Sequence, residues 1–307
     1  MNCMNRMNKV TKIAKIIIFL VFFLLLLSCG TGDDFGSKTA DFKTGVKELS
    51  VTASFPRTVF QDNNWQGPLA LKNNAGYDAD NIQVSLIGLD QRLIALADVT
   101  LPVNLLEGRS LYLKEGGEER IVFEGTVRQL PAGIDQKQLN YLILVSYSSK
   151  VEFSPTVCVD SGLYIVGSGC DFKEINADKT SRTKAQPFSG QGAPVVFNSL
   201  EVIPYIGTDS KIELRMKIAD RGRGRIKSLR LGRAVLGNIP LQCDFRGKQV
   251  SRTNPGVAEF TEKDQHQEID LVCSGELESN SAYQTALFIE LFYDYEFIIK
   301  DSLEIRR

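Results

Sequence analysis

The chain has 307 residues, of which 43% are hydrophobic and 24% are charged, a composition typical of a globular protein. Its 36 basic and 37 acidic residues give a formal net charge of −1. Without a basic excess the chain lacks the electrostatic footprint of a nucleic-acid-binding protein, so we expect no nucleic-acid partner. The length allows two domains of about 150 residues each.

Residues 1–28 are predicted to form a secretory signal peptide. The basic residues of this segment come first, at Arg6, Lys9, Lys12 and Lys15. An unbroken apolar run follows at 16–27, and no acidic residue occurs before Asp33. A basic segment, a short apolar run and a small residue before the cleavage site are typical of such signals. A transmembrane helix needs about 20 apolar residues, so an uncleaved membrane helix is the weaker alternative.

The end of this segment, Leu26-Leu27-Ser28-Cys29, resembles the lipobox of bacterial and archaeal lipoproteins. The resemblance implies that Cys29 becomes the first mature residue and carries a two-chain glycerolipid. Two chains are needed because one chain alone binds a membrane only marginally. Residues 29–45 are polar and rich in glycine, and we predict that they form a flexible tether. The expected location is therefore extracytoplasmic, with the cell membrane as a partner through the lipid on Cys29.

Residues 46–159 are predicted to form a β-sandwich. Apolar and polar residues alternate at 48–53 and 82–86, as they do in strands with one buried face. Turn-forming residues, such as those at 73–76, separate the apolar runs. Residues 147–151 are interpreted as a hairpin turn near the end of this domain. Short strands at this spacing favour a sandwich.

A second β-rich block at 194–307 follows a loop-like segment at 160–193, which we interpret as an interdomain linker because so long a loop is unusual inside one domain. The two blocks are similar to each other. Residues 144–153 align without a gap on 290–299, and 74–76 align on 220–222. Such internal repetition predicts tandem domains of one fold.

One stretch of the first block also carries a family resemblance. Residues 69–86 are similar to the CARDB type of immunoglobulin-like domain of archaeal and bacterial surface proteins, in which a strand ends in N-x-G. Residues 212–226 match less well, with Asp220 in place of the usual Asn. The resemblance implies an all-β protein with two tandem immunoglobulin-like sandwiches behind a signal peptide and tether, as in surface lipoproteins. It carries over no catalytic residue.

Four cysteines remain once Cys3 is removed with the signal and Cys29 is lipidated. They are Cys158, Cys170, Cys243 and Cys273. An even number in an oxidising compartment predicts disulfides, and four cysteines allow three pairings. Proximity in the chain favours Cys158–Cys170 and Cys243–Cys273. No C-x₂₋₄-C pair exists, so the spacing does not fit zinc, and we predict no metal site.

Catalytic motifs are poorly represented in the chain. His266 is the only histidine and lies in a polar run, where an exposed surface position is expected. No G-x-S-x-G, H-E-x-x-H or P-loop motif occurs, so we predict neither enzymatic activity nor a cofactor. A two-carboxylate glycosidase needs no histidine, and Glu290 and Asp294 are the candidate acids of that minor alternative. Residues 78–81 have oxygen ligands suited to calcium, but a simple turn is the preferred interpretation.

Two further features are candidates for binding a partner. The strongest charge cluster contains Arg221, Arg223, Arg225, Lys227, Arg230 and Arg233. Arginine forks suit carboxylate and phosphate, so this cluster is a candidate patch for an anionic partner, the alternative being a solvated hairpin. Trp65 could stack on a sugar, although we favour a place at the edge of a sandwich core.

These features predict a membrane-anchored, non-catalytic surface interaction or adhesion module, with a surface protein or a glycan as its expected partner. The alternatives are a structural spacer or accessory subunit of an envelope complex and, with less support, a carbohydrate-active enzyme. An exposed apolar or aromatic patch on an outer sheet face would favour the binding module. An evenly charged surface would favour the spacer, and a deep acid-lined pocket the enzyme.

Overall fold

The structure is a computed structural model that describes residues 41–159, 170, 174–175, 182–205, 211–250, 254–261, 268–277 and 282–307. Contacts divide the chain into two compact units, Met1–Asp41 and Phe42–Arg307, and we call the second unit the body. The predicted signal peptide, Cys29, most of the tether and His266 lie outside the described residues. Across the described ranges, no helix is both long enough and apolar enough to span a membrane.

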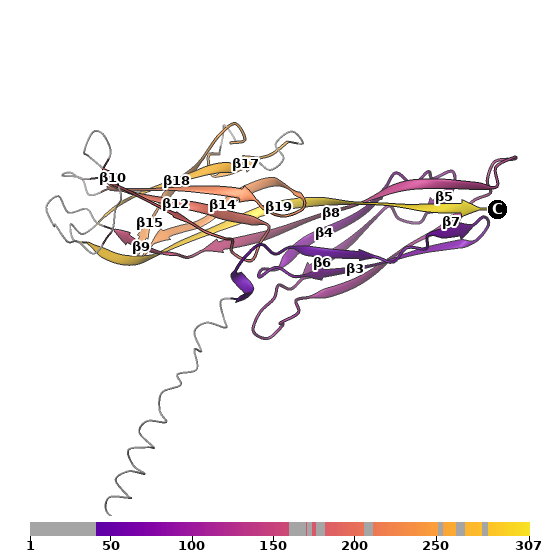
Figure 1. The fold of residues 1–307 in the computed structure, drawn as a ribbon, viewed down its shortest axis with the longest axis horizontal. Helices are drawn as coiled ribbons and strands as arrows, with labels where there is room; N and C mark the ends of the chain where they lie inside the picture. The colour runs from indigo at the N-terminus through magenta and orange to yellow at the C-terminus, as the bar shows by residue number, and fades with distance from the viewer. Residues whose placement is uncertain are drawn as a thin grey trace, which may run out of the picture. The chain divides into compact units, whose positions relative to one another are not determined.

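The described part of the body is built from β-strands in three sheets, which confirms the all-β sandwich class (Figure 1). A short 3-10 helix, η1 (Asp41–Lys43), precedes them. The first sheet has the order β1 (Leu49–Ala53), β3 (Asn64–Asn73), β7 (Glu118–Val127), β5 (Ile94–Leu96). The second sheet has the order β10 (Glu174–Ile175), β11 (Arg182–Pro187), β12 (Val195–Tyr205), β13 (Lys211–Asp220), β18 (Glu268–Glu276), β16 (Gln242–Arg246).

The third sheet, which we call the central sheet, joins strands from both halves of the body. Its order is β15 (Ile239–Pro240), β14 (Arg225–Leu236), β19 (Tyr283–Arg306), β8 (Gln136–Phe153), β4 (Ala79–Ile87), β6 (Thr100–Leu106). Three short strands pair off this path: β17 (Val257–Glu259) with β14, and β2 (Thr58–Phe60) and β9 (Thr156–Val159) with β19. We call residues 42–159 the N-terminal half and 182–307 the C-terminal half.

Two long strands hold the halves together. β8 has 18 residues and β19 has 24, and they pair antiparallel from Gln136↔Arg306 to Phe153↔Ile289. Figure 1 shows the two strands side by side through the body. Near the start of β8, Tyr141 stacks on Phe55 of the N-terminal half, with ring centroids 5.5 Å apart. At the other end of β8, Phe153 stacks on Phe197 of β12 at 4.5 Å, so this one strand packs into the cores of both halves.

The two halves repeat one arrangement of strands. The order β1-β3-β7-β5 of the first sheet corresponds to β12-β13-β18-β16 of the second. Leu49 pairs with Asn73, and Val195 pairs with Asp220 at the corresponding position. The aligned segments 144–153 and 290–299 belong to β8 and β19, and these equivalent strands pair with each other. The structural repeat therefore matches the sequence repeat in these strands, with Asn73 rather than Asn74 as the counterpart of Asp220.

The predicted hairpin turn at 147–151 is wrong, because these residues lie inside β8. Burial alternates without interruption from Leu139 to Phe153, which is the pattern of an extended strand. The partner strand β19 runs opposite this whole segment, with Ser148 facing Asp294. β8 of the N-terminal half and β19 of the C-terminal half therefore provide backbone hydrogen-bond partners to each other along this length.

The described part of the predicted linker, 160–193, contains a strand that the sequence analysis did not predict. Residues 182–187 form β11, which pairs with β12. The side chain of Gln191 is buried and accepts a bond from Phe197 N at 2.8 Å. Most of 160–181 lies outside the described residues. The two halves are joined by hydrogen-bonded strands as well as by the covalent chain, because β8 pairs with β19.

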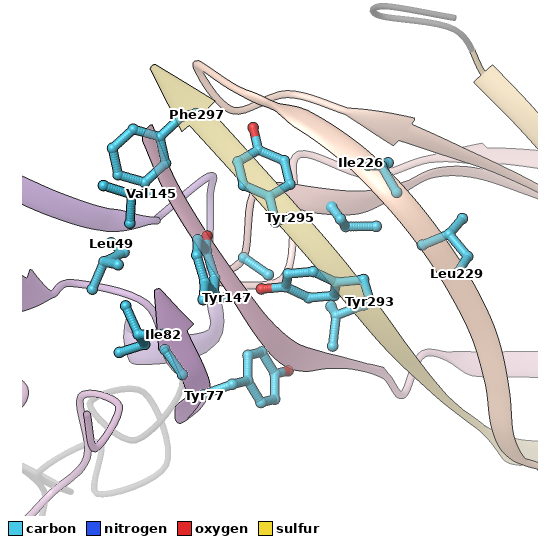
Figure 2. Packing of buried hydrophobic residues seen from close by; sticks show 14 of the residues in the cluster. Leu49, Tyr77, Ile82, Val145, Tyr147, Ile226, Leu229, Tyr293, Tyr295 and Phe297 are labelled. Carbon is cyan, nitrogen blue, oxygen red and sulfur yellow. The ribbon is translucent and has the colours of Figure 1, made fainter. Parts of the chain in front are cut away.

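A buried tyrosine cluster lies where the halves meet (Figure 2). Tyr147 of β8 lies 5.7 Å from Tyr295 of β19, and Tyr295 lies 6.3 Å from Tyr293. Burial raises the pKa of Tyr147, Tyr293 and Tyr295 well above the usual value. Residues of the N-terminal half, such as Leu49 and Ile82, and of the C-terminal half, such as Ile226 and Leu229, belong to the same hydrophobic cluster.

Both predicted disulfides are present. Cys158 of β9 is bonded to Cys170, and Cys243 of β16 is bonded to Cys273 of β18. The second pair lies directly opposite in the sheet register. In the chain-entropy model, closing loops with separations of 12 and 30 residues stabilises the fold by about 3 kcal/mol each.

Candidate functional site

A hollow of about 940 Å³ lies over the outer face of the central sheet, and we call it the central-sheet hollow. A row of directly opposed polar residues crosses five strands at its floor. From β4 to β17 the row is Asp80, Ser148, Asp294, Ser228 and Glu259. Opposed residues of antiparallel strands share one face and lie about 5 Å apart. Carboxylates and hydroxyls therefore alternate across the sheet.

Asp294 is the centre of this row. Ser148 Oγ donates a hydrogen bond of 2.7 Å to its Oδ1, and Ser228 Oγ donates one of 2.6 Å to its Oδ2. Each serine uses its hydroxyl hydrogen in this bond, so its oxygen lone pairs remain as acceptors. The carboxylate is held in one orientation and also retains acceptor capacity. Such a floor can receive ligand hydroxyl and amide groups.

Basic and aromatic side chains flank the row. The Arg230 guanidinium lies 5.0 Å from the centroid of the Phe292 ring, and both residues line the central-sheet hollow. Glu296, which is buried, forms ion pairs with Arg225 and with Lys227, the latter at 3.2 Å. Two of the basic residues of this sheet face are therefore already matched by a carboxylate of the protein.

The six residues of the predicted basic cluster do not form one patch. Arg225 and Lys227 pair with Glu296, and Arg230 lies on Phe292. Arg221 and Arg223 occupy the loop before β14 and line a second hollow of about 620 Å³, while Arg233 is exposed on β14. The register of β14 shifts between Ile226 and Ser228 and again between Leu231 and Ala234. The first shift places Arg225 and Arg230, which are five residues apart, opposite Glu296 and Phe292 on the same sheet face.

The second hollow, which we call the basic hollow, contains residues that the sequence analysis did not select. Lys47 and Arg109 line it beside Arg221 and Arg223, opposite the single carboxylate of Glu48. These residues come from segments far apart in the chain, so no sequence motif could have grouped them.

The other candidate residues have structural places. Trp65 is buried, with its ring 5.4 Å from Phe55 in an edge-to-face contact, which confirms the core interpretation. Asp78 Oδ1 accepts a 2.7 Å bond from Gly108 N, as a residue that shapes a turn does. Glu290 accepts a 3.0 Å bond from Lys150 Nζ. Within the described ranges, no group of three or more His, Cys, Asp or Glu side chains is arranged to hold a metal.

Comparisons with known proteins add little to this description. No protein-family model matches the chain, and no curated protein matches it. Among solved structures, the chain is similar to a serine-rich repeat adhesion glycoprotein (Srr1) from Streptococcus agalactiae. The identity is 10%, the match covers 85% of this chain and 96% of that chain, and the TM-score is 0.17. A TM-score of this size does not establish a shared fold. The strands and disulfides themselves define an all-β sandwich protein with two covalent cross-links.

Proposed function

We propose that this protein is a membrane-anchored, extracytoplasmic binding module without catalytic activity, and that it recognises a hydroxyl-rich surface ligand such as a glycan. The observation that carries the proposal is the floor of the central-sheet hollow. There, two serine hydroxyls orient the Asp294 carboxylate from both sides. A concave face with a few fixed polar groups and an adjacent aromatic ring is typical of a ligand site.

The proposed location has support from covalent chemistry. Two disulfides join Cys158 to Cys170 and Cys243 to Cys273, and such bonds persist in oxidising compartments outside the cytoplasm. The lipid on Cys29 and the cleavage of residues 1–28 complete the proposal, on the strength of the lipobox resemblance.

Apolar side chains beside the hollow support binding over a purely structural role. On the same sheet face, Ile298 is 52% exposed and pairs with Leu144, and Ile87 is 46% exposed and pairs with Leu142. An exposed apolar strip next to a polar hollow is the pattern expected of an interaction surface. The spacer remains the second candidate, because the paired β8 and β19 give the body two continuous strands through both halves.

The carboxylates of this sheet face favour binding over glycoside hydrolysis. Glu152 and Glu290 lie opposite each other in the register, and Lys150 Nζ bonds to both, at 2.9 and 3.0 Å. Burial raises the pKa of Glu152, but hydrogen bonds from Lys43 and Lys150 outweigh it, so the pKa is lowered. A glycosidase needs one carboxyl with a raised pKa as general acid, and the pKa of Glu152 is shifted in the other direction.

A glycan array probed with the body tests the proposal. We expect binding to a subset of immobilised glycans, and Asp294→Ala should weaken it about tenfold or more, because one hydrogen bond to a charged group contributes about 1.5–3 kcal/mol. Asp98→Ala, at an exposed position outside the hollow, is the matched control and should bind as the unchanged protein does. Equal binding by Asp294→Ala and Asp98→Ala would contradict the proposed site.

A further inference from the structure

The loop between β6 and β7 presents an apolar tip to solvent. Tyr112 is 99% exposed and Leu111 is 53% exposed. The tip is a tight turn, in which Ser110 N donates to Leu113 O at 3.0 Å and Leu113 N donates to Ser110 Oγ at 3.0 Å. Two large hydrophobic side chains are therefore exposed to solvent at the end of a closed turn.

The base of this loop is fixed to the turn after β3. Gly108 N donates to Asp78 Oδ1 at 2.7 Å, and Arg109 N donates to Ala75 O at 2.8 Å. Gly116 has a φ of +75°, and a Cβ atom there would lie 1.8 Å from Asn73 O, so only glycine fits. The apolar tip is therefore held out from the body by an ordered base.

Basic residues flank the tip in the chain. They are Arg109 and Lys114, and Arg109 Nε donates to Lys114 O at 2.7 Å. Arg109 also lines the basic hollow, where it joins Lys47, Arg221 and Arg223. Its lining contains these four basic side chains and the carboxylate of Glu48, with which Arg223 pairs at 3.1 Å, although the chain without residues 1–28 has 32 basic against 37 acidic residues. The positive charge is a local concentration on an acidic protein.

These features lie beside the start of the body. The Arg109 guanidinium is 5.6 Å from the centroid of the Phe42 ring, and Phe42 is the first residue of the body. Lys47, which follows five residues later, lines the basic hollow. The tether predicted from the sequence places 12 residues, 30–41, between Cys29 and Phe42, and a tether of that length with glycine-rich flexibility would have a root-mean-square span of about 20 Å. A lipid on Cys29 would therefore hold this part of the body close to the membrane surface.

We infer that the Leu111–Tyr112 tip and the basic hollow together dock the body onto an anionic phospholipid surface. Tyrosine and leucine suit the boundary between headgroups and acyl chains, where one end of the phenol is apolar and the other is wet. Arginine binds lipid phosphate groups through its fork of N–H donors. The closeness to the membrane rests on the proposed anchor at Cys29, but the affinity itself belongs to the body.

The test uses the body alone, residues 42–307, which forms a compact unit separate from residues 1–41. We expect it to sediment with phosphatidylcholine vesicles that contain phosphatidylglycerol, less with phosphatidylcholine alone, and less at high salt. Leu111→Ser combined with Tyr112→Ser should reduce partitioning about tenfold or more, through the loss of buried apolar area. Arg109→Gln and Arg221→Gln should each reduce it about fivefold and flatten the salt dependence.

A matched control separates the tip from general surface hydrophobicity. Phe60→Ser removes a side chain of β2 that is 51% exposed, similar to Leu111, and it should partition as the unchanged body does. Equal sedimentation of the tip variant and the unchanged body would overturn the inference. The inference would also be overturned if inorganic phosphate abolished vesicle binding while the tip variant still bound vesicles. The basic hollow would then be a site for free anions. Glycan binding by the tip variants reports on the central-sheet hollow separately, so failure of one proposal is distinguishable from failure of the other.

Discussion

Two equivalent turns of the repeat, after β3 and after β13, use different residues for the same task. Asn73 is 1% exposed, and its Oδ1 accepts a 3.0 Å bond from Ala75 N. Asp220 is 8% exposed, and its Oδ1 accepts a 2.9 Å bond from Gly222 N. Both side chains therefore close a turn onto a backbone amide two residues later, as Asn and Asp commonly do.

The groups that face each turn explain the choice of residue. Asn73 Nδ2 donates to two carbonyls, Tyr77 O and Leu106 O, each at 2.9 Å. Asp220 Oδ1 instead accepts from the Tyr295 hydroxyl at 2.9 Å. An amide is needed where acceptors must be satisfied, and a carboxylate serves where donors converge. The first turn is thereby hydrogen-bonded to Leu106, which ends β6 before the β6–β7 loop. The second turn is hydrogen-bonded to Tyr295 of the long strand β19.

Exchange of the amide for a carboxylate at the first turn should have the largest effect. Asn73→Asp would place a buried acceptor against Tyr77 O and Leu106 O, where two donors are required. We expect a loss of about 4 kcal/mol in the free energy of unfolding. Urea denaturation of the body measures it. Asn74→Asp is the control, because Asn74 is only partly buried and bonds to Ser50 Oγ, and a similar loss for both variants would contradict this account.

The second turn should depend on an acceptor oxygen. Asp220→Ala leaves the Tyr295 hydroxyl and Gly222 N without this partner, and we expect a loss of about 2–3 kcal/mol in the free energy of unfolding. Asp220→Asn keeps an acceptor at Oδ1 and should cost less than about 1 kcal/mol. Thermal or urea unfolding of the two variants compares them directly. If Asp220→Asn were as damaging as Asp220→Ala, the carboxylate would have a role beyond accepting these bonds.

Alkaline pH should act on the second turn through the Tyr295 hydroxyl. Burial, followed by the nearby Asp220 charge, raises the pKa of Tyr295 above its usual value. The unfolded chain releases this proton near pH 10, so its contribution to stability is complete below pH 10 and declines above it by about 1.4 kcal/mol per pH unit. Tyr295→Phe should make the free energy of unfolding fall less steeply above pH 10.

The control for this pH dependence is Tyr112→Phe at an exposed site, which should leave the slope unchanged. Asn73→Asp should also leave the slope above pH 10 unchanged, because its first-turn bonds involve no tyrosine hydroxyl. Urea unfolding across this pH range gives all three slopes. A slope that Tyr295→Phe did not alter would mean that this hydroxyl stays protonated in both states or ionises equally in both.

The sequence alone predicted those features that local patterns control. Alternating polar and apolar residues indicated strands, because one face of each sheet is buried. The favoured disulfide pairs followed from closeness in the chain, with separations of 12 and 30 residues. The repeat was visible because equivalent strands kept similar side chains. A buried place for Trp65 followed from ordinary core packing.

Tertiary structure alone decided how these parts are combined. Residues 147–151 carry serines that suit a turn, yet the strand continues, because β19 supplies hydrogen-bond partners along its length. The basic cluster divides because Arg221 and Arg223 lie in the loop before β14 and line the basic hollow, and because Glu296, on another strand, pairs with Arg225 and Lys227. The polar row through Asp294 and the basic hollow with Lys47 and Arg109 unite residues from distant segments. Such sites depend on strand register and bulges, which long-range pairing sets and local sequence does not.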